Sequence, residues 1–326
     1  MLRPRPVSRT RIILTLLAVQ TLFGTLPLTG QTLMRHIPPV GTATLRSVGA
    51  ALVFAMICGR RLAAIRLRDL PWLVLFTCLG IVGNQVLFLE GLSRSTQINA
   101  AVLITTIPVF TVGFALALRR ETASALKLGG IAVGLAGALL LARIESFDLS
   151  DRTALGNLFI IANCSLWSLY LVLARPLLVR IPPLVMISWM FLLGGAALAP
   201  FGLPAVVEGL AGAPAATWGV AAWIVAGPTV LAYLLNVQAL GAAESSQVAI
   251  FTYLQPLVAG VLAWAFAGEG LDLRTALAAV LIFAGVALVQ LRGRQVAQRV
   301  DTGTEIDFAS VPPAEHPRSR GQEDDQ

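Results

Sequence analysis

The sequence predicts an all-α membrane protein of ten transmembrane helices, arranged as two inverted repeats of five helices each. Three observations carry this prediction. The 326-residue chain is 56% hydrophobic and only 13% charged, whereas about a quarter of the residues in soluble domains are charged. The chain divides into apolar runs that are long enough to cross about 30 Å of hydrocarbon at about 1.5 Å per residue. Prolines and glutamates recur in register between the two halves of the chain.

The apolar runs are expected to be the transmembrane helices, joined by short loops. In chain order they cover residues 12–34, 38–58, 70–92, 97–118, 124–142, 155–178, 181–203, 217–239, 245–267 and 273–291. The first run is too long for a signal peptide, and no small-residue cleavage pattern follows it. We expect one repeat in residues 1–143, the other in 144–291, and a disordered cytoplasmic tail in 292–326, where there is little to bury.

Basic residues predict the orientation of the chain. With the N-terminus inside, 17 of the 24 Lys and Arg residues fall in inner segments and five in outer loops. This bias places both termini in the cytoplasm. The net charge of +7 is therefore explained by basic residues on the cytoplasmic side, close to the anionic headgroups of the lipid bilayer. No nucleic-acid partner is expected.

The internal repeat is clearest at two prolines. Pro108, in ITTIPVF, and Pro256, in TYLQPLV, lie 148 residues apart. The IPP at 37–39 recurs at 181–183 with an offset of 144, so a short insertion near the seventh-to-eighth connection explains the change. Five helices is an odd number, so the second unit must enter the membrane from the opposite side. Inverted repeats of this kind are typical of secondary transporters, whose sites lie near the bilayer midplane.

The prolines interrupt their helices near the centre of a span. Each removes a backbone donor, and in lipid the freed carbonyl needs a partner from protein or a water-filled cavity. Two breaks at matching depth predict a midplane cavity, with simple helix packing as the other interpretation. Glu121 and Glu269 follow the breaks at equal spacing, beside Arg119 and Arg120 or near Arg274. We expect these two glutamates to form structural or gating ion pairs with the arginines.

Two ionisable residues are expected inside spans, where such groups are functional candidates. Arg46, about 12 Å from the outer end of the second helix, suits bidentate binding of a carboxylate or other anionic substrate. The alternatives are that it snorkels outward or pairs with Glu90. Glu90, near the outer end of the third helix, is a candidate for proton coupling or gating, and a facilitative or exchange mechanism fits equally.

Uncharged polar residues gather around the two breaks and are expected to hydrogen-bond a polar solute. Bonding between helices is the alternative for any one of them. The candidates for substrate binding are Asn84, Gln85, Thr105, Thr106, Asn163, Ser168, Tyr233, Asn236, Tyr253 and Gln255. The aromatic residues expected to wall the site are Trp167, Tyr170, Trp189, Tyr233 and Tyr253.

These features resemble the drug/metabolite transporter superfamily, EamA branch, from about residue 14 to 291. The resemblance is carried by LFGTLPL, IPP-x6-R, GLSRSTQINAAVLITTIPVFTVGFALALRRE, GAAESSQVAIFTYLQPLVAGVLAWAFAGE and LIFAGVALV. Members place a proline in the fourth and ninth helices and a glutamate just after each. Gly24-Thr25 departs from the Trp-Gly pair of many relatives. The resemblance implies an inner-membrane transporter that exports amino acids or related metabolites.

Other classes are disfavoured or left open. The sequence has no P-loop, no HExxH and no filter-like repeat, so an ATP-driven motor, an enzyme, a cofactor or metal site and a channel are not expected. A non-transporting receptor or scaffold on the same fold and a multidrug efflux carrier remain alternatives. Gly130-x3-Gly134 suits close helix packing, within the bundle or in a homodimer.

Overall fold

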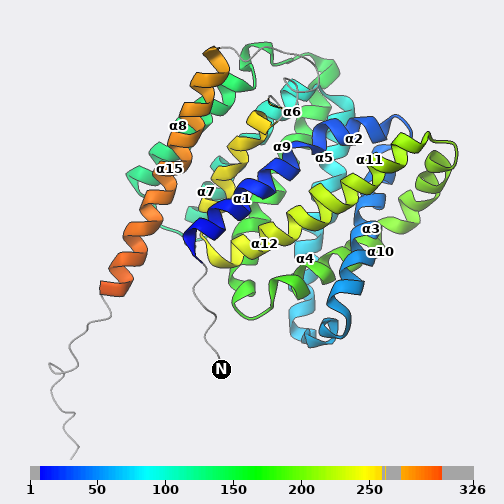
Figure 1. The fold of residues 1–326 in the computed structure, drawn as a ribbon, viewed down its shortest axis with the longest axis horizontal. Coiled ribbons are helices and arrows are strands. Elements are labelled where there is room, and N and C mark those ends of the chain that lie inside the picture. Colours follow the sequence, from blue (N-terminus) through cyan, green and yellow to red (C-terminus); the bar gives the residue numbers. More distant parts are fainter. Residues whose placement is uncertain (1–7, 259–260, 262–272, 303–326) are drawn as a thin grey trace, which may run out of the picture.

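The structure, a computed structural model, is a bundle of helices and describes residues 8–258, 261 and 273–302, with no strand among them (Figure 1). Eight of its helices are long and apolar enough to cross a membrane. They correspond to the first four predicted runs and to the sixth, seventh, eighth and tenth. The fifth run forms a shorter apolar helix, and only part of the ninth run lies within the described residues. The chain is therefore a multi-pass membrane protein.

Five elements are long single helices, and the other spans are divided. The single helices are α3 (Pro39–Cys58), α8 (Ala125–Leu141), α9 (Asp151–Ala174), α10 (Pro183–Ala211) and α15 (Leu273–Thr302). The divided spans are α1 (Arg9–Gly24) with α2 (Leu26–Met34), α4 (Leu70–Thr77) with α5 (Gly83–Arg94), α6 (Gln97–Ile104) with α7 (Ile107–Ala117), and α11 (Ala215–Val225) with α12 (Ala232–Ala242). The ninth span starts with α13 (Ser245–Ala249).

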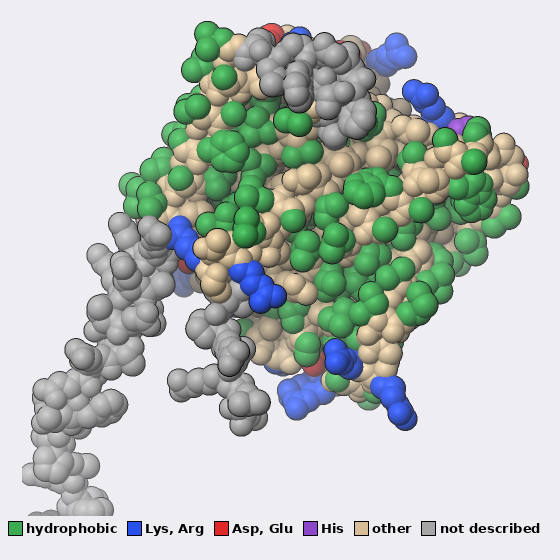
Figure 2. Space-filling view, viewed as in Figure 1, with side chains coloured by type: hydrophobic (Ala, Val, Ile, Leu, Met, Phe, Trp, Pro, Cys, Tyr) green, Lys and Arg blue, Asp and Glu red, His purple; other side chains and the backbone are tan. Residues whose placement is uncertain are grey.

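The surface of the bundle suits a lipid environment. Figure 2 shows hydrophobic side chains spread across the middle of one face, with Lys and Arg side chains mostly at its margins. Large apolar side chains such as Leu52, Met56 and Phe201 are exposed on the outside of the bundle. Water would penalise so much exposed apolar surface, whereas hydrocarbon does not.

The fourth span breaks where the sequence predicts it. α6 ends at Ile104, and α7 restarts at Ile107 with Pro108 in its first turn. A proline is tolerated there because the first-turn N–H groups have no partner within the helix. In the ninth span a 3-10 turn, Ile250–Leu254, precedes Pro256. The first span also breaks, at Thr25, which the sequence did not predict.

Two π-helical turns interrupt the third and eighth spans. They cover Cys78–Val82 and Ala226–Leu231 and begin 148 residues apart, which is the offset of the two prolines. Such turns are rare and are found disproportionately at functional sites. The sequence predicted both spans as unbroken, because apolar residues continue through each turn.

Corresponding helices of the two units pack against each other. α3 lies along α10, and α8 lies along α15 (Figure 1). α1 packs against α12, and its counterpart α9 packs against α5. The two units therefore interlock around a shared centre rather than forming two separate bundles.

Glycines allow the closest of these approaches. A Cβ added to Gly130 would lie 2.8 Å from the Gly285 carbonyl oxygen, and one added to Gly285 would lie 2.5 Å from the Gly134 nitrogen. Real Cβ contacts are not this short, so α8 and α15 can meet here only with glycine. The Gly130-x3-Gly134 motif therefore packs inside the chain.

Two predicted helix ends were wrong. α10 continues to Ala211, beyond the predicted end at 203, although it contains Pro200 and Pro204. α15 continues to Thr302, so the predicted disordered tail does not begin at residue 292. The Arg, Gln and Ala residues that follow Leu291 favour helix, and a helix once formed propagates readily. Residues 303–326 and Glu269 lie outside the described residues.

Candidate functional site

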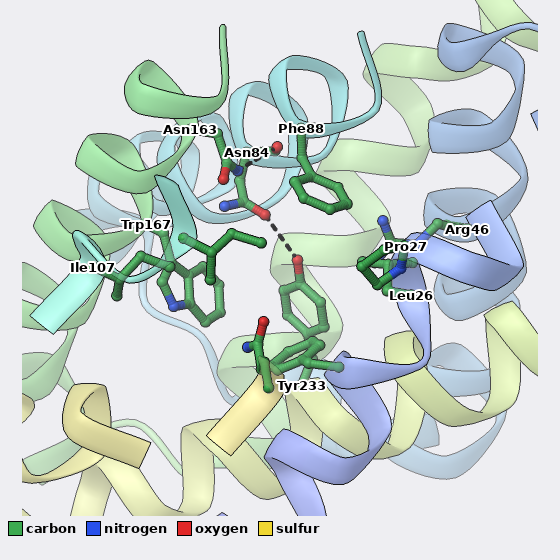
Figure 3. A pocket seen from close by; sticks show the side chains of 12 residues that line it. Leu26, Pro27, Arg46, Asn84, Phe88, Ile107, Asn163, Trp167 and Tyr233 are labelled. Carbon is green, nitrogen blue, oxygen red and sulfur yellow. Dashed lines mark hydrogen bonds between the residues drawn. The ribbon is translucent and has the colours of Figure 1, made fainter. Parts of the chain in front are cut away.

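A central cavity of about 70 Å³ lies where the interrupted spans meet (Figure 3). It is lined by Phe23, Leu26, Pro27, Arg46, Asn84, Phe88, Ile104, Ile107, Asn163, Trp167, Tyr233 and Gln255. Phe23, Leu26 and Pro27 flank the break in the first span, and Ile104 and Ile107 flank the break in the fourth. The chain breaks and the cavity therefore coincide.

Arg46 is the only charged residue among the described residues that line this cavity. Its side chain is 1% exposed, and its Nε donates a hydrogen bond of 3.0 Å to the Thr229 hydroxyl. No ion pair involves Arg46 in the described part of the chain. The alternative pairing with Glu90 does not occur, because Glu90 pairs with Arg94 one turn along at 2.9 Å, and a buried Arg46 does not snorkel.

Amides and a phenol form the polar wall opposite. The Tyr233 hydroxyl donates to Asn84 Oδ1 at 3.1 Å (Figure 3). Asn163 Nδ2 donates to the Asn84 backbone carbonyl at 2.8 Å, which ties α9 to α5. Gln85 lies next to this wall, 1% exposed, and its amide makes no hydrogen bond. An unsatisfied buried amide costs about 1–3 kcal/mol, so the Gln85 amide is the costly group beside this wall.

Aromatic rings form the apolar wall. Phe23, Trp167 and Tyr233 pack edge to face, with centroids 5.5 to 6.1 Å apart and planes 76° to 87° apart. Tyr170 and Phe191 extend this cluster away from the cavity. Such pairs are favoured by the ring quadrupoles and hold the rings in fixed orientations. The site therefore combines one cation, a few amides and a rigid apolar surface.

The structure brings together only some of the predicted site residues. Arg46, Asn84, Asn163, Tyr233 and Gln255 line the cavity, with Trp167 among the predicted wall residues. The remaining predicted residues, which do not line it, are Gln85, Thr105, Thr106, Ser168, Tyr170, Trp189, Asn236 and Tyr253.

Hydroxyl groups at the fourth-span break are used within the protein. Thr105 and Thr106 donate to the carbonyls of Val102 and Leu103, at 2.6 and 2.7 Å. Ser168 of α9 donates to the Ile107 carbonyl at 3.0 Å. These three hydroxyl groups therefore bond to backbone carbonyls near the break, which agrees with the alternative that they hold helices together and do not bind substrate. Of the other residues outside the cavity, Asn236 and Tyr253 are buried.

Two polar partners of the site were missed by sequence reasoning. Thr229 accepts the hydrogen bond from Arg46, and Gln20 accepts one of 2.8 Å from Gln255 Nε2. Both are polar residues inside apolar runs, so the sequence shows that they are unusual. It does not show what they bind, because each partner lies more than 180 residues away in the chain.

A buried ion cluster lies away from the cavity, at the start of α8. Lys127 Nζ contacts Glu121 Oε2 at 2.6 Å and Glu244 Oε2 at 2.9 Å, and its side chain is 1% exposed. Burial alone would raise the pKa of the Glu121 carboxyl, but hydrogen bonds from Lys127 and Ser246 outweigh it and hold that pKa below its usual range. The expected neighbours Arg119 and Arg120 are not its ion partners. The cluster joins the first unit to the second.

A second ion pair lies at the α15 end. Arg274 binds the Glu145 carboxylate with both terminal nitrogens, which lowers the pKa of Glu145 to about 2. The sequence had placed Arg274 near Glu269, which lies outside the described residues. The described residues contain no group of three or more His, Cys, Asp or Glu residues able to hold a metal ion.

The chain matches the EamA-like transporter family over residues 10–143 and 154–291. An uncharacterized transporter of Archaeoglobus fulgidus is 28% identical over 63% of this chain and 71% of its own length. A probable terminal-alkyne amino-acid exporter of Streptantibioticus cattleyicolor is 28% identical over 76% of this chain and 82% of its own. One crystal structure superposes with a TM-score of 0.70 over 89% of this chain and 99% of its own, at 21% identity, which shows the shared fold.

Proposed function

Because the chain belongs to the EamA-like transporter family, we propose that it is a secondary transporter that carries a small polar metabolite across the cell inner membrane by alternating access. The proposed substrates are amino acids or related compounds, and the proposed direction is export. The amino-acid exporter among its relatives supports the substrate class. The proposed topology has two inverted five-helix units and cytoplasmic termini, supported by the paired packing of corresponding helices.

The observation that carries this proposal is the buried Arg46 at the central cavity. Its guanidinium interacts with the hydroxyl groups of Thr229 and Tyr233 and has no carboxylate partner among the described residues. A buried charge without a counter-charge is costly, and attraction to an anionic group offsets that cost. The negative group of a bound metabolite supplies the missing partner.

The cavity is small for a substrate site. At about 70 Å³ it is well below the roughly 300–1,000 Å³ of typical ligand pockets. An amino acid enters only if the surrounding helices move apart. The breaks beside Pro108 and Pro256 are where backbone hydrogen bonds are already missing, so bending there costs least. We assign these two positions as hinges of the gates.

The Lys127 cluster is the proposed closure on the cytoplasmic side. It ties Glu121 and the start of α8 in the first unit to Glu244, which precedes α13 in the second. An inward-facing state requires these contacts to separate. Glu90 and Glu269 remain candidates for gating on the outer side.

The test is an untargeted comparison of growth medium from bacterial cells that overproduce the protein or an Arg46→Met variant at equal membrane levels. We expect one class of amino acids or related solutes to accumulate outside only with the unchanged protein. Identical media from both strains would contradict the assignment of the site and favour a receptor or scaffold. Accumulation of structurally unrelated cationic or neutral compounds would instead favour a multidrug efflux carrier.

A further inference from the structure

The π-helical turn of the eighth span arranges an unusual hydrogen bond. Pro228 lies inside this turn and has no N–H to donate to the carbonyl of Ile224, four residues earlier. The Thr229 hydroxyl donates to that carbonyl instead, at 2.6 Å. The hydroxyl hydrogen of Thr229 is therefore committed to the backbone, and only its oxygen lone pairs remain available.

Those lone pairs meet Arg46. The Arg46 Nε–H donates to Thr229 Oγ1 at 3.0 Å, and both side chains are buried, at 1% and 0% exposure. Gly49, on α3, allows this approach, because a Cβ there would lie 2.9 Å from Val225 Cγ1. Thr229 can therefore only accept a hydrogen bond from Arg46, and it fixes the edge of the guanidinium that carries Nε.

The opposite end of the guanidinium is directed to the cavity. Besides Thr229, the Arg46 guanidinium interacts with the Tyr233 phenol at the cavity. No carboxylate pairs with it among residues 8–258 and 273–302, and Figure 3 shows Arg46 at the cavity edge. Two parallel N–H groups match the two oxygens of one carboxylate. The aromatic wall of Phe23 and Trp167 supplies apolar surface for the remainder of such a molecule.

We propose that Thr229 is a positioning residue that sets Arg46 to bind a single carboxylate end-on, so that the substrate is a small monocarboxylate with an apolar body. This inference rests on the proposed transport function. One cation lines the cavity among the described residues, so a second negative group on the substrate has no partner there. Amides and alcohols that replace the carboxylate are rejected, because they leave the buried guanidinium without a counter-charge.

The experiment uses purified full-length protein in liposomes loaded with alanine, valine, leucine and phenylalanine, or with the carboxamides of these amino acids. We expect the acids to leave and the carboxamides to stay. Thr229→Val keeps the side-chain shape and removes the acceptor. We expect it to raise the half-saturating concentration of the acids by about tenfold to a hundredfold, with the maximal rate nearly unchanged. Thr229→Ser keeps the acceptor and should restore the value.

The outcomes separate the inference from the proposed function. If carboxamides leave as fast as the acids, transport stands and the carboxylate inference fails. If Thr229→Val and Thr229→Ser both lower the melting temperature and the maximal rate without changing half-saturation, Thr229 is structural only. If no acid leaves and none raises the melting temperature of the protein, the amino-acid transport proposal fails together with the inference.

Discussion

At the scale of single residues, the site depends on charges and amides placed in an apolar interior. Arg46, Asn84, Asn163 and Gln255 were predictable because polar side chains stand out in apolar runs. Thr229 was not, because its role depends on a partner from the other unit and on a proline-freed carbonyl. Composition therefore shows which residues are costly to bury, whereas only the packed chain shows what each of them contacts.

The Glu121 carboxyl gives a prediction on pH. Its pKa is lowered in the folded protein, so its contribution to stability is present above its ordinary pKa of 4.5 and is lost as pH falls through the lower folded value. We expect the melting temperature in detergent to fall less steeply below about pH 4.5 for Glu121→Gln than for the unchanged protein. At pH 7 the variant should melt several degrees lower, because breaking a buried pair costs about 3–5 kcal/mol.

Glu145→Gln is the matched control for this prediction. Glu145 is more than half exposed and pairs with Arg274 at the surface, where ion pairs contribute little. We expect its melting temperature at pH 7 to stay close to that of the unchanged protein. Parallel melting curves for Glu121→Gln and the unchanged protein between pH 7 and pH 3 would contradict the role given to Glu121.

At the scale of elements, hydropathy locates the helices but not their interruptions. The prolines predicted the break between α6 and α7. The π-helical turns and the break at Thr25 were not predicted, because apolar residues run through them without a change in pattern. The same elements line the cavity, so the part of the fold that sequence periodicity resolves least well is the part that carries the site.

Pro108→Ala tests the fourth-span hinge. Alanine supplies an N–H for the Ile104 carbonyl and favours a continuous helix, which stiffens the break. We expect the maximal transport rate to fall about tenfold, with half-saturation changed less, because hinge residues set the rate of conformational steps. Pro200→Ala and Pro204→Ala, in α10, are the controls, since neither proline lines the cavity. An equal loss of rate in all three variants would contradict a special role for Pro108.

Gly130→Ala tests the close approach of α8 and α15. The added methyl group would meet the Gly285 carbonyl oxygen at 2.8 Å, and overpacking of this kind costs about 1–3 kcal/mol. We expect a lower melting temperature in detergent. Gly129→Ala changes the adjacent residue, whose Cβ would meet nothing within 4 Å, and should be neutral or slightly stabilising. Equal melting temperatures for Gly130→Ala and Gly129→Ala would contradict this close approach of α8 and α15.

At the scale of the whole molecule, the internal repeat explains the architecture. The offsets seen in the sequence predicted two units, and the structure pairs α3 with α10 and α8 with α15 across them. The sequence did not predict how the units seal against each other. The Lys127 cluster joins residues that are 117 apart, and no local pattern reports a contact at that separation. A single central cavity between two related units is the arrangement that alternating access requires.

The most direct test of this account is whether the central cavity opens to each side of the membrane in turn. Phe88→Cys, at the cavity wall, is made in a chain whose Cys58, Cys78 and Cys164 are replaced by alanine. Right-side-out and inside-out vesicles are then treated with a membrane-impermeant maleimide. The account predicts that the introduced thiol reacts in both kinds of vesicle, because each state of the cycle opens the cavity to one side. Reaction in neither, or in only one under all conditions, would contradict alternating access through this cavity.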